Sequence, residues 1–252
     1  MKTMGSRIVQ HCLLPIGITC LILGVSPISI QAEWMLSLYG GIAHTLDSDV
    51  RLKEPGDTRL TFRDVAWDDE SFQEPQYFGF RLTYWLSRQS PWGLAVDFTH
   101  AKMIAELDED ASVSGRRGGE LVSTREALGD SFAKLEFSHG HNLLTANVLY
   151  RWLAHNRPSW FGRLQPYAGL GAGVAIPHVE VITASSVTGD YQFAGPAVQG
   201  LAGLHIDLIK HLSVFAEFRL SYAHLDVDLQ GDGSLETDTW TYHFNIGLSL
   251  ST

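Results

Sequence analysis

Residues 212–222 read LSVFAEFRLSY, and this stretch decides the fold. Every second residue, beginning with Leu212, is apolar or small, and the residues between them include Ser213, Glu217 and Arg219. A period of two puts the first set on one face of a β-strand and the second set on the other. The stretch therefore predicts a strand with one apolar face and one polar face.

The same alternation recurs along the chain and predicts eight strands of about ten residues each. The other seven segments are 34–39, 78–86, 92–99, 144–152, 169–176, 198–206 and 240–248. An even number of such strands is typical of outer-membrane barrels, which are apolar outside and polar inside. A water-soluble barrel with its apolar face inside gives the same alternation, so a second observation must separate the two classes.

The connections between these segments supply that observation. Long connections (44–76, 103–140, 225–238) alternate with short or medium ones (87–91, 153–164, 207–211), and 177–190 is fairly long. Outer-membrane barrels have long extracellular loops and short periplasmic turns. Aromatic residues at both strand ends fit two interfacial girdles; they are Trp92, Trp152, Trp160, Tyr222, Trp240 and Tyr242. We predict an all-β, eight-stranded antiparallel transmembrane β-barrel.

The N-terminal segment 1–32 has the features of a cleaved signal peptide. It carries Lys2 and Arg7, an apolar run, and the small residue Ala32 at its end, and it holds both cysteines, Cys12 and Cys20. The mature chain, 33–252, is then a single barrel domain without a disulfide. We predict export to the outer membrane of a Gram-negative bacterium, as a monomer.

The charge balance argues against nucleic acid as a partner. The net charge is −10, and the sequence shows no basic cluster beyond Arg116-Arg117. The inward faces of the predicted strands nevertheless collect charges that must pair with one another, because they are removed from bulk water. We interpret the set as an ion-paired plug that fixes strand register, with a proton path or a buried site as the alternative. Its charged and polar members are Arg81, Asp97, Asn147, Arg151, Gln199, Glu217, Arg219 and His243.

The outward face at the extracellular strand ends is the predicted place for chemistry. His100 and Lys102 continue one apolar row, His178 and Glu180 continue another, and Asn142 lies at the same height on the strand between them. Two imidazoles and a carboxylate form a metal site with open positions, as in O₂-using iron sites. We predict His100, His178 and Glu180 as catalytic metal ligands, and Lys102 and Asn142 as substrate-binding residues that face lipid A headgroups. The alternative is that polar residues merely end these strands.

Two further histidine motifs are candidates for a catalytic or metal-binding site. His211-Leu212-Ser213 with Glu217 resembles the His-x-Ser and glutamate of lipid A deacylase barrels, but it lies on the periplasmic side with inward parity. An acyl hydrolase acting on the outer leaflet needs its nucleophile near the outer surface, so we expect no catalysis there. His139-Gly140-His141 offers another ligand pair, or marks a junction between loop and strand.

Segments that span the mature chain in order resemble the rhizobial lipid A oxidase family. They include residues 33–34, 38–41, 71–79, 97–102, 135–137, 166–171, 177–181, 191–192, 195–197 and 215–217, of which His100-Ala101-Lys102 and Pro177-His178-Val179-Glu180-Val181 are the more specific. The resemblance implies an outer-membrane enzyme that oxidises the proximal glucosamine of 1-dephosphorylated lipid A to 2-aminogluconate, consuming O₂ and releasing hydrogen peroxide. Lipid A within lipopolysaccharide is then the partner.

The implied reaction favours a metal cofactor. The C1 hemiacetal must pass hydride equivalents to O₂, no side chain does this alone, and the sequence has no Rossmann-type flavin motif. We therefore expect a divalent metal, iron or another, with O₂ as co-substrate. The alternative from another class is a non-enzymatic barrel that stabilises the envelope or contacts surfaces through its loops.

Overall fold

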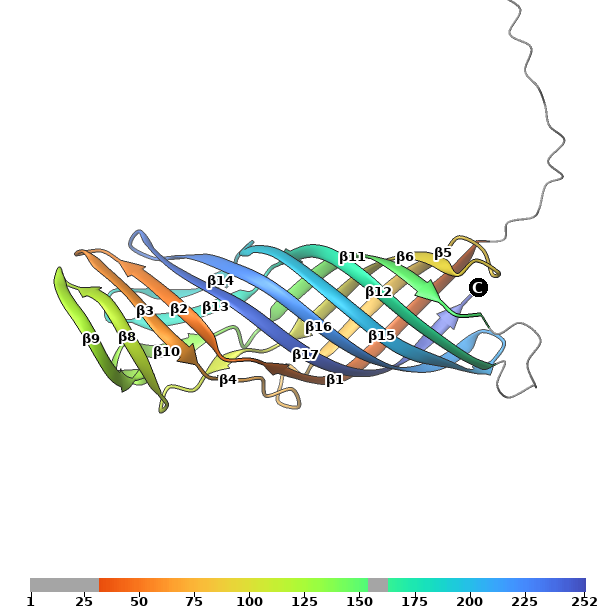
Figure 1. Ribbon diagram of the computed structural model, residues 1–252, viewed down its shortest axis with the longest axis horizontal. Coiled ribbons are helices and arrows are strands. Elements are labelled where there is room, and N and C mark those ends of the chain that lie inside the picture. The colour runs from red at the N-terminus through yellow and green to blue at the C-terminus, as the bar shows by residue number, and fades with distance from the viewer. Residues whose placement is uncertain (1–31, 154–162) are drawn as a thin grey trace, which may run out of the picture. The chain divides into compact units, whose positions relative to one another are not determined.

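The computed structural model describes residues 32–153 and 163–252, and eight strands in this part of the chain close a hydrogen-bonded ring (Figure 1). The ring is antiparallel throughout and closes where β1 pairs with β17. Closure confirms the predicted eight-stranded barrel. In order around the ring, the strands are β1 (Glu33–Thr45), β5 (Phe78–Trp85), β6 (Trp92–Ala101), β11 (His141–Arg151), β12 (Leu164–Ala175), β15 (Gly195–Ile209), β16 (Leu212–Leu229) and β17 (Gly233–Ser251).

Gln31–Thr252 forms one compact unit. The predicted signal peptide and Trp160 fall on residues outside the described ranges, apart from Ala32. None of the helices described is long and apolar enough to cross a membrane. The short turns 86–91 and 210–211 join strands at the end of the ring that also holds Glu33 and Ser251, and this is the periplasmic end in barrels of this kind.

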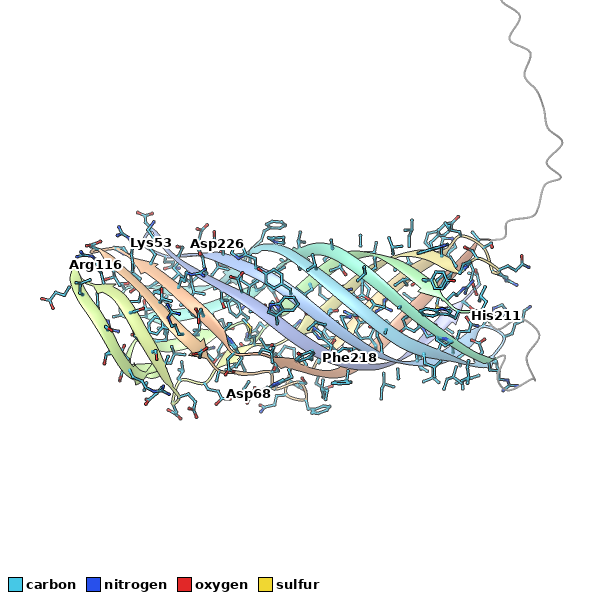
Figure 2. The ribbon with its side chains drawn as sticks, in the orientation of Figure 1. Lys53, Asp68, Arg116, His211, Phe218 and Asp226 are labelled. Carbon is cyan, nitrogen blue, oxygen red and sulfur yellow. The ribbon has the colours of Figure 1, made fainter. Side chains whose placement is uncertain are left out.

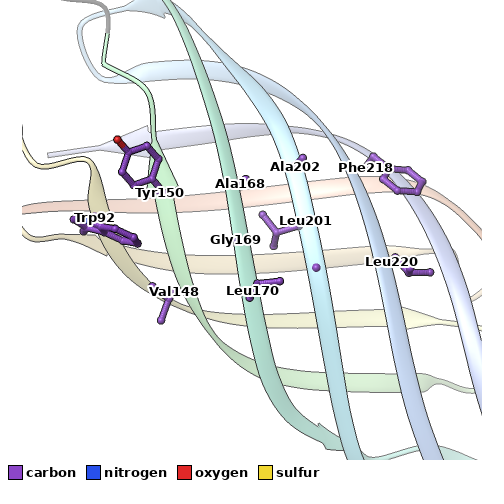
Figure 3. Close-up of a pocket in the computed structure, with 11 residues that line it drawn as sticks. Trp92, Val148, Tyr150, Ala168, Gly169, Leu170, Leu201, Ala202, Phe218 and Leu220 are labelled. Atoms are coloured by element: carbon purple, nitrogen blue, oxygen red, sulfur yellow. The ribbon is translucent and has the colours of Figure 1, made fainter.

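The outer face of the ring is apolar. Large hydrophobic side chains stand exposed on it, among them Leu38, Leu94, Leu170 and Ile246. Figure 3 shows one region of this face, a hollow of about 580 Å³ that lies over Gly169 and neighbouring small residues and contains no carboxylate, imidazole or amine. Exposed apolar surface of this extent is stable against hydrocarbon and unstable against water, so the ring spans a membrane.

The interior of the ring confirms the predicted charge pairing. Arg81 Nε lies 2.5 Å from Asp97 Oδ2 and Arg81 Nη1 lies 2.7 Å from Glu217 Oε2. Arg219 Nη2 lies 2.9 Å from Glu217 Oε1 and 3.2 Å from Asp97 Oδ2, and Tyr39 donates to Asp97 at 2.6 Å. Two cations and two carboxylates therefore neutralise one another across β5, β6 and β16.

Beyond the ring, the connections expected to be loops form two further layers of strands. β2 (Ser48–Glu54), β3 (Thr58–Val65), β8 (Asp110–Arg117) and β9 (Glu120–Ala127) extend the barrel sheet from β17. A five-stranded sheet contains β14 (Val187–Tyr191), β13 (His178–Thr183), β10 (Phe132–Glu136), β7 (Ile104–Ala105) and β4 (Trp67–Asp68), and one 3-10 turn, η1 (Leu128–Asp130), precedes β10.

The extracellular strands enclose an apolar core of their own. Phe62, Leu135, Val181 and Leu225 are fully buried in it. Within the membrane the barrel interior is polar, whereas here the interior is apolar because the surroundings are water. The expected loops thus become ordered strands, because their alternating apolar residues find a partner layer to pack against.

The same inversion is visible along single strands. On β17, Phe244 and Ile246 face outward in the ring and His243 and Asn245 face inward. Nearer the extracellular tip, Leu235 faces inward and its neighbours in the sequence are polar and partly exposed. The change occurs near Trp240, which therefore marks the outer edge of the membrane-spanning band.

We expect Asp97→Asn to lower the free energy of unfolding by about 3 kcal/mol, because removing one partner leaves buried arginine charge uncompensated. The measurement is denaturant-induced unfolding of the barrel in lipid vesicles. The control is Asp57→Asn, which removes an exposed carboxylate 3.3 Å from Arg59 and should change stability by less than about 1 kcal/mol. Equal effects of the two substitutions would contradict a structural role for the buried network.

Candidate metal centre

His178 and Glu180 project from the same face of β13. The strand alternates, so Val179 and Val181 point the opposite way and are fully buried in the extracellular core. The side chains of His178 and Glu180 are 20% and 15% exposed. The apolar half of this strand therefore anchors the polar half at the rim of the barrel.

His139 joins them from the connection between β10 and β11. The backbone N–H of His178 donates to the carbonyl of Gly140 at 2.8 Å, which docks this connection against β13. Gly140 has a φ of +133°, and a Cβ there would lie 2.5 Å from the Asn142 amide, so glycine is required. Tyr191 completes the docking by donating to the carbonyl of His139 at 3.1 Å.

The three side chains form a set of metal-ligand atoms. One atom from each of His139, His178 and Glu180 lies within 4.8 Å of the others. Nδ1 of His139 contacts Oε1 of Glu180, and Nδ1 of His178 lies 3.3 Å from the same oxygen. That approach of His178 is not a hydrogen bond, and the buried Nδ1 has no hydrogen-bond partner among the described residues. Two imidazoles and a carboxylate with an unsatisfied nitrogen fit a divalent transition metal.

Lys134 places a positive charge beside the set. Its ammonium contacts Oε2 of Glu180 and lies 3.3 Å from Oε2 of Glu136, which pairs with Glu180 across the strands. Burial raises the pKa of Glu180, but hydrogen bonds from Lys134 and His139 outweigh it and hold that pKa below its usual value. The carboxylate is ionised and already paired, so a metal ion must compete with Lys134 for it.

The residues predicted from the sequence divide into two groups. His178 and Glu180 come together as expected, but the described ligand set contains His139 in place of His100. His100 stacks on Phe78 at 5.0 Å, and its Nδ1 lies 2.8 Å from Oδ1 of Asn142. The sequence predicts that His100 and Asn142 lie at the same height on neighbouring strands. In the structure their side chains form a hydrogen-bonded pair.

Lys102 lies beneath the first extracellular connection. Its ammonium donates to the carbonyl of Glu74 at 3.0 Å and lies 3.9 Å from Glu70, and the side chain is only 5% exposed. Contact with a lipid headgroup would require this connection to move. The substrate-binding roles of Lys102 and Asn142 stay predictions.

The remaining residues of the histidine motifs lie away from the ligand set. His141, the second member of the His139-Gly140-His141 motif, is 1% exposed and belongs to the barrel wall. His211 is exposed at the periplasmic turn with its Nδ1 near the carbonyl of Ser251, whereas Ser213 is buried inside the ring. The His-x-Ser motif therefore forms no site on the outer face.

Sequence reasoning had a signal for His139 but none for Lys134. The sequence shows His139 as one member of the His139-Gly140-His141 motif. Which of the two histidines can bind a metal at the rim depends on the direction in which each ring points, and the sequence does not give this direction. Lys134 reaches Glu180 only because β10 pairs with β13, in a stretch expected to be a loop.

The closed ring, its apolar outer band and its ordered extracellular strands define an outer-membrane β-barrel. No family model matches the sequence, and no curated protein matches it. Three solved structures show what the chain is similar to. Neisserial surface protein A has 11% identity over 87% of this chain and 97% of that chain, with a TM-score of 0.40.

The outer membrane protein OprG from Pseudomonas aeruginosa has 13% identity over 88% of this chain and 96% of that chain, with a TM-score of 0.42. Ail, the attachment invasion locus protein of Yersinia pestis, has 17% identity over 85% of this chain and 99% of that chain, with a TM-score of 0.31. At these values the class rests on the geometry of this chain and not on the similarities.

We expect His139→Ala to weaken divalent metal binding by about 100-fold or more, because it removes a ligand, and His100→Ala to leave binding unchanged. The measurement is titration of the refolded mature chain in detergent with Mn²⁺ and Zn²⁺ by calorimetry. His211→Ala, a histidine at the opposite end of the barrel, is the control. Loss of binding in His100→Ala alone would restore the ligand set expected from the sequence.

We expect Lys134→Met to tighten metal binding by about tenfold, because it removes a cation that competes for Glu180. The same calorimetric titration measures the change. Lys53→Met, which removes an exposed lysine from β2, controls for the loss of one positive charge. Weaker binding in Lys134→Met would show that the ammonium orients the carboxylate for the metal and does not compete with it.

Proposed function

We propose that this barrel is an O₂-dependent lipid A oxidase, acting at the centre formed by His139, His178 and Glu180. The observation that carries the proposal is a two-imidazole, one-carboxylate set on the outward face at the extracellular rim. The segments that resemble the rhizobial lipid A oxidase family support it, and two of the three ligands lie within one of those segments.

The location suits a substrate held in the outer leaflet. His139 is 60% exposed, so a ligand of the centre is open to the surroundings. Phe78 stacks on the ring of His100 and is 46% exposed on the apolar outer face of the ring of strands. A lipid with its acyl chains against the ring would present its first sugar at this height.

The reaction removes two electrons and two protons from the C1 hemiacetal and transfers them to O₂, which becomes hydrogen peroxide. The sugar product is the lactone, and water opens it to 2-aminogluconate. A 1-phosphate blocks this reaction, because no C1 hydroxyl remains to lose its proton. A divalent metal on the three ligands would supply the electron path to O₂.

The chain's own residues then hold the substrate and its proton. Glu136 lies opposite Glu180 on the neighbouring strand and is the carboxylate left free of the ligand set. In the proposed reaction Glu136 accepts the proton of the C1 hydroxyl. Lys134, whose ammonium lies 3.3 Å from Glu136, can donate to a sugar oxygen once a metal takes Glu180.

A second candidate function is a non-enzymatic surface role. The extracellular strands form a packed body, and Leu121 at the tip of the β8–β9 hairpin is 81% exposed. We infer that this ordered body, which projects beyond the membrane with Leu121 at its tip, would contact another surface in that role.

The test is mass spectrometry of lipid A from a host whose lipid A lacks the 1-phosphate and which expresses the protein. We expect the proximal unit to gain one oxygen, or to lose two hydrogens as the lactone, only with O₂ present and chelator absent. His178→Ala and Glu180→Ala should abolish turnover and still assemble, because both side chains lie outside the buried cores. His211→Ala should retain full activity.

Full activity in both His178→Ala and Glu180→Ala would show that these residues are not needed for the reaction. Unchanged lipid A with an assembled wild-type barrel would favour the surface role. That role predicts loss of surface binding when residues 116–121 are replaced by a short turn, an excision that spares the buried Val113.

A further inference from the structure

The outer face of the extracellular sheet carries a row of basic residues. Lys53 on β2 pairs in register with Arg59 on β3, and Arg59 pairs with Arg116 on β8. All three are exposed, and Leu52 and Leu60, their neighbours in the sequence, are buried in the core behind them. Figure 2 shows Lys53 and Arg116 at the same end of the barrel.

This row is only partly neutralised. Arg59 lies 3.3 Å from Asp57, and Arg51, two residues before Lys53, lies 3.4 Å from Glu236. Within the described ranges no carboxylate forms an ion pair with Lys53 or Arg116. Like charges directly opposite one another destabilise a sheet, so an anion bound on this face would stabilise it.

The face is also hollowed. Arg51, Lys53 and Arg59 line a depression of about 350 Å³. The hydroxyls of Thr61, Ser114 and Ser234 and one carboxylate, that of Glu236, complete its polar lining, and Glu236 is paired with Arg51. Gly115 in its floor has a φ of +136°, and a Cβ there would lie 2.0 Å from the carbonyl oxygen of Arg59. Guanidinium and ammonium groups beside hydroxyls are the donors that recognise phosphate and carboxylate groups on sugars.

The position of the hollow indicates which molecule lies beside it in the membrane. The outward face of β17 continues from Trp240, at the edge of the apolar band, to Ser234, which pairs with Lys53. The six residue-to-residue steps from Trp240 to Ser234 span roughly 20 Å along the strand. A lipid whose acyl chains lie against the ring and whose sugars extend away from the membrane would pass its sugars along this face.

We propose that this basic hollow binds an anionic sugar of the lipopolysaccharide core, phosphorylated or carboxylated, from a lipid next to the barrel. The site lies on β2, β3 and β8 and shares no residue with the metal centre on β10 and β13, so it does not depend on the proposed oxidase activity. The occupant is a neighbouring lipopolysaccharide because the face is lateral and continuous with the lipid-facing band.

The test compares the wild-type chain with Lys53→Glu/Arg59→Glu, both in detergent micelles. The probes are lipopolysaccharide with a phosphorylated inner core and the same preparation hydrolysed to lipid A. We expect the variant to bind core-bearing lipopolysaccharide about tenfold or more weakly, with a reduced salt dependence, and to bind lipid A as the wild type does. Lys53→Gln/Arg59→Gln should fall between the two.

The matched control is Arg88→Glu/Lys210→Glu, which makes the same charge change on exposed residues at the periplasmic turns. Heat-modifiable mobility, the difference in gel migration between unheated and heated samples, verifies that each barrel is folded. Unchanged affinity in Lys53→Glu/Arg59→Glu would overturn the proposal, and so would an equal loss in the control.

Discussion

The hydrogen-bonded pairing of β1 with β17 is the contact on which the rest of the structure depends. It runs from Met35 opposite Ser251 to Thr45 opposite Thr241 and leaves the ring without an open edge. In hydrocarbon each unpaired backbone group costs several kcal/mol, so an open sheet would not be stable there. Closing eight strands also leaves a lumen just wide enough for side chains, which forces Arg81, Asp97 and their partners into mutual contact.

The solvent outside the ring then decides what each strand face can carry. Inside the membrane the outward positions must be apolar, and beyond Trp240 the outward positions face water and become polar. The metal centre and the basic hollow both lie in this second region, on faces whose opposite sides are anchored in the extracellular core. The core holds Val179 and Val181 behind the metal centre, and Leu52 and Leu60 behind the basic row. The proposed chemistry and the proposed sugar binding therefore depend on the same packed core.

Electrostatics gives the two sites opposite characters. At the candidate metal centre, Glu136 and Glu180 face each other and the ammonium of Lys134 compensates their charge. In the basic row beside the hollow, cations face one another across β2, β3 and β8, and carboxylates compensate only part of their charge. The first site would bind the proposed metal only by displacing Lys134 from Glu180, whereas the second would bind the proposed anion without displacing a carboxylate from Lys53.

The sequence by itself determined the strands, their faces and the pairing of His178 with Glu180, because a period of two is local and places residues i and i+2 together. It also contains a signal for the extracellular strands, since Val50 and Leu52 alternate with Arg51 and Lys53 within the long connection 44–76. Only the tertiary structure decided that His139 joins the ligand set, that Lys134 reaches Glu180, and that Lys53, Arg59 and Arg116 form a row. These contacts join strands far apart in the chain, and their register is set by packing between layers and by ring closure, which no local pattern encodes.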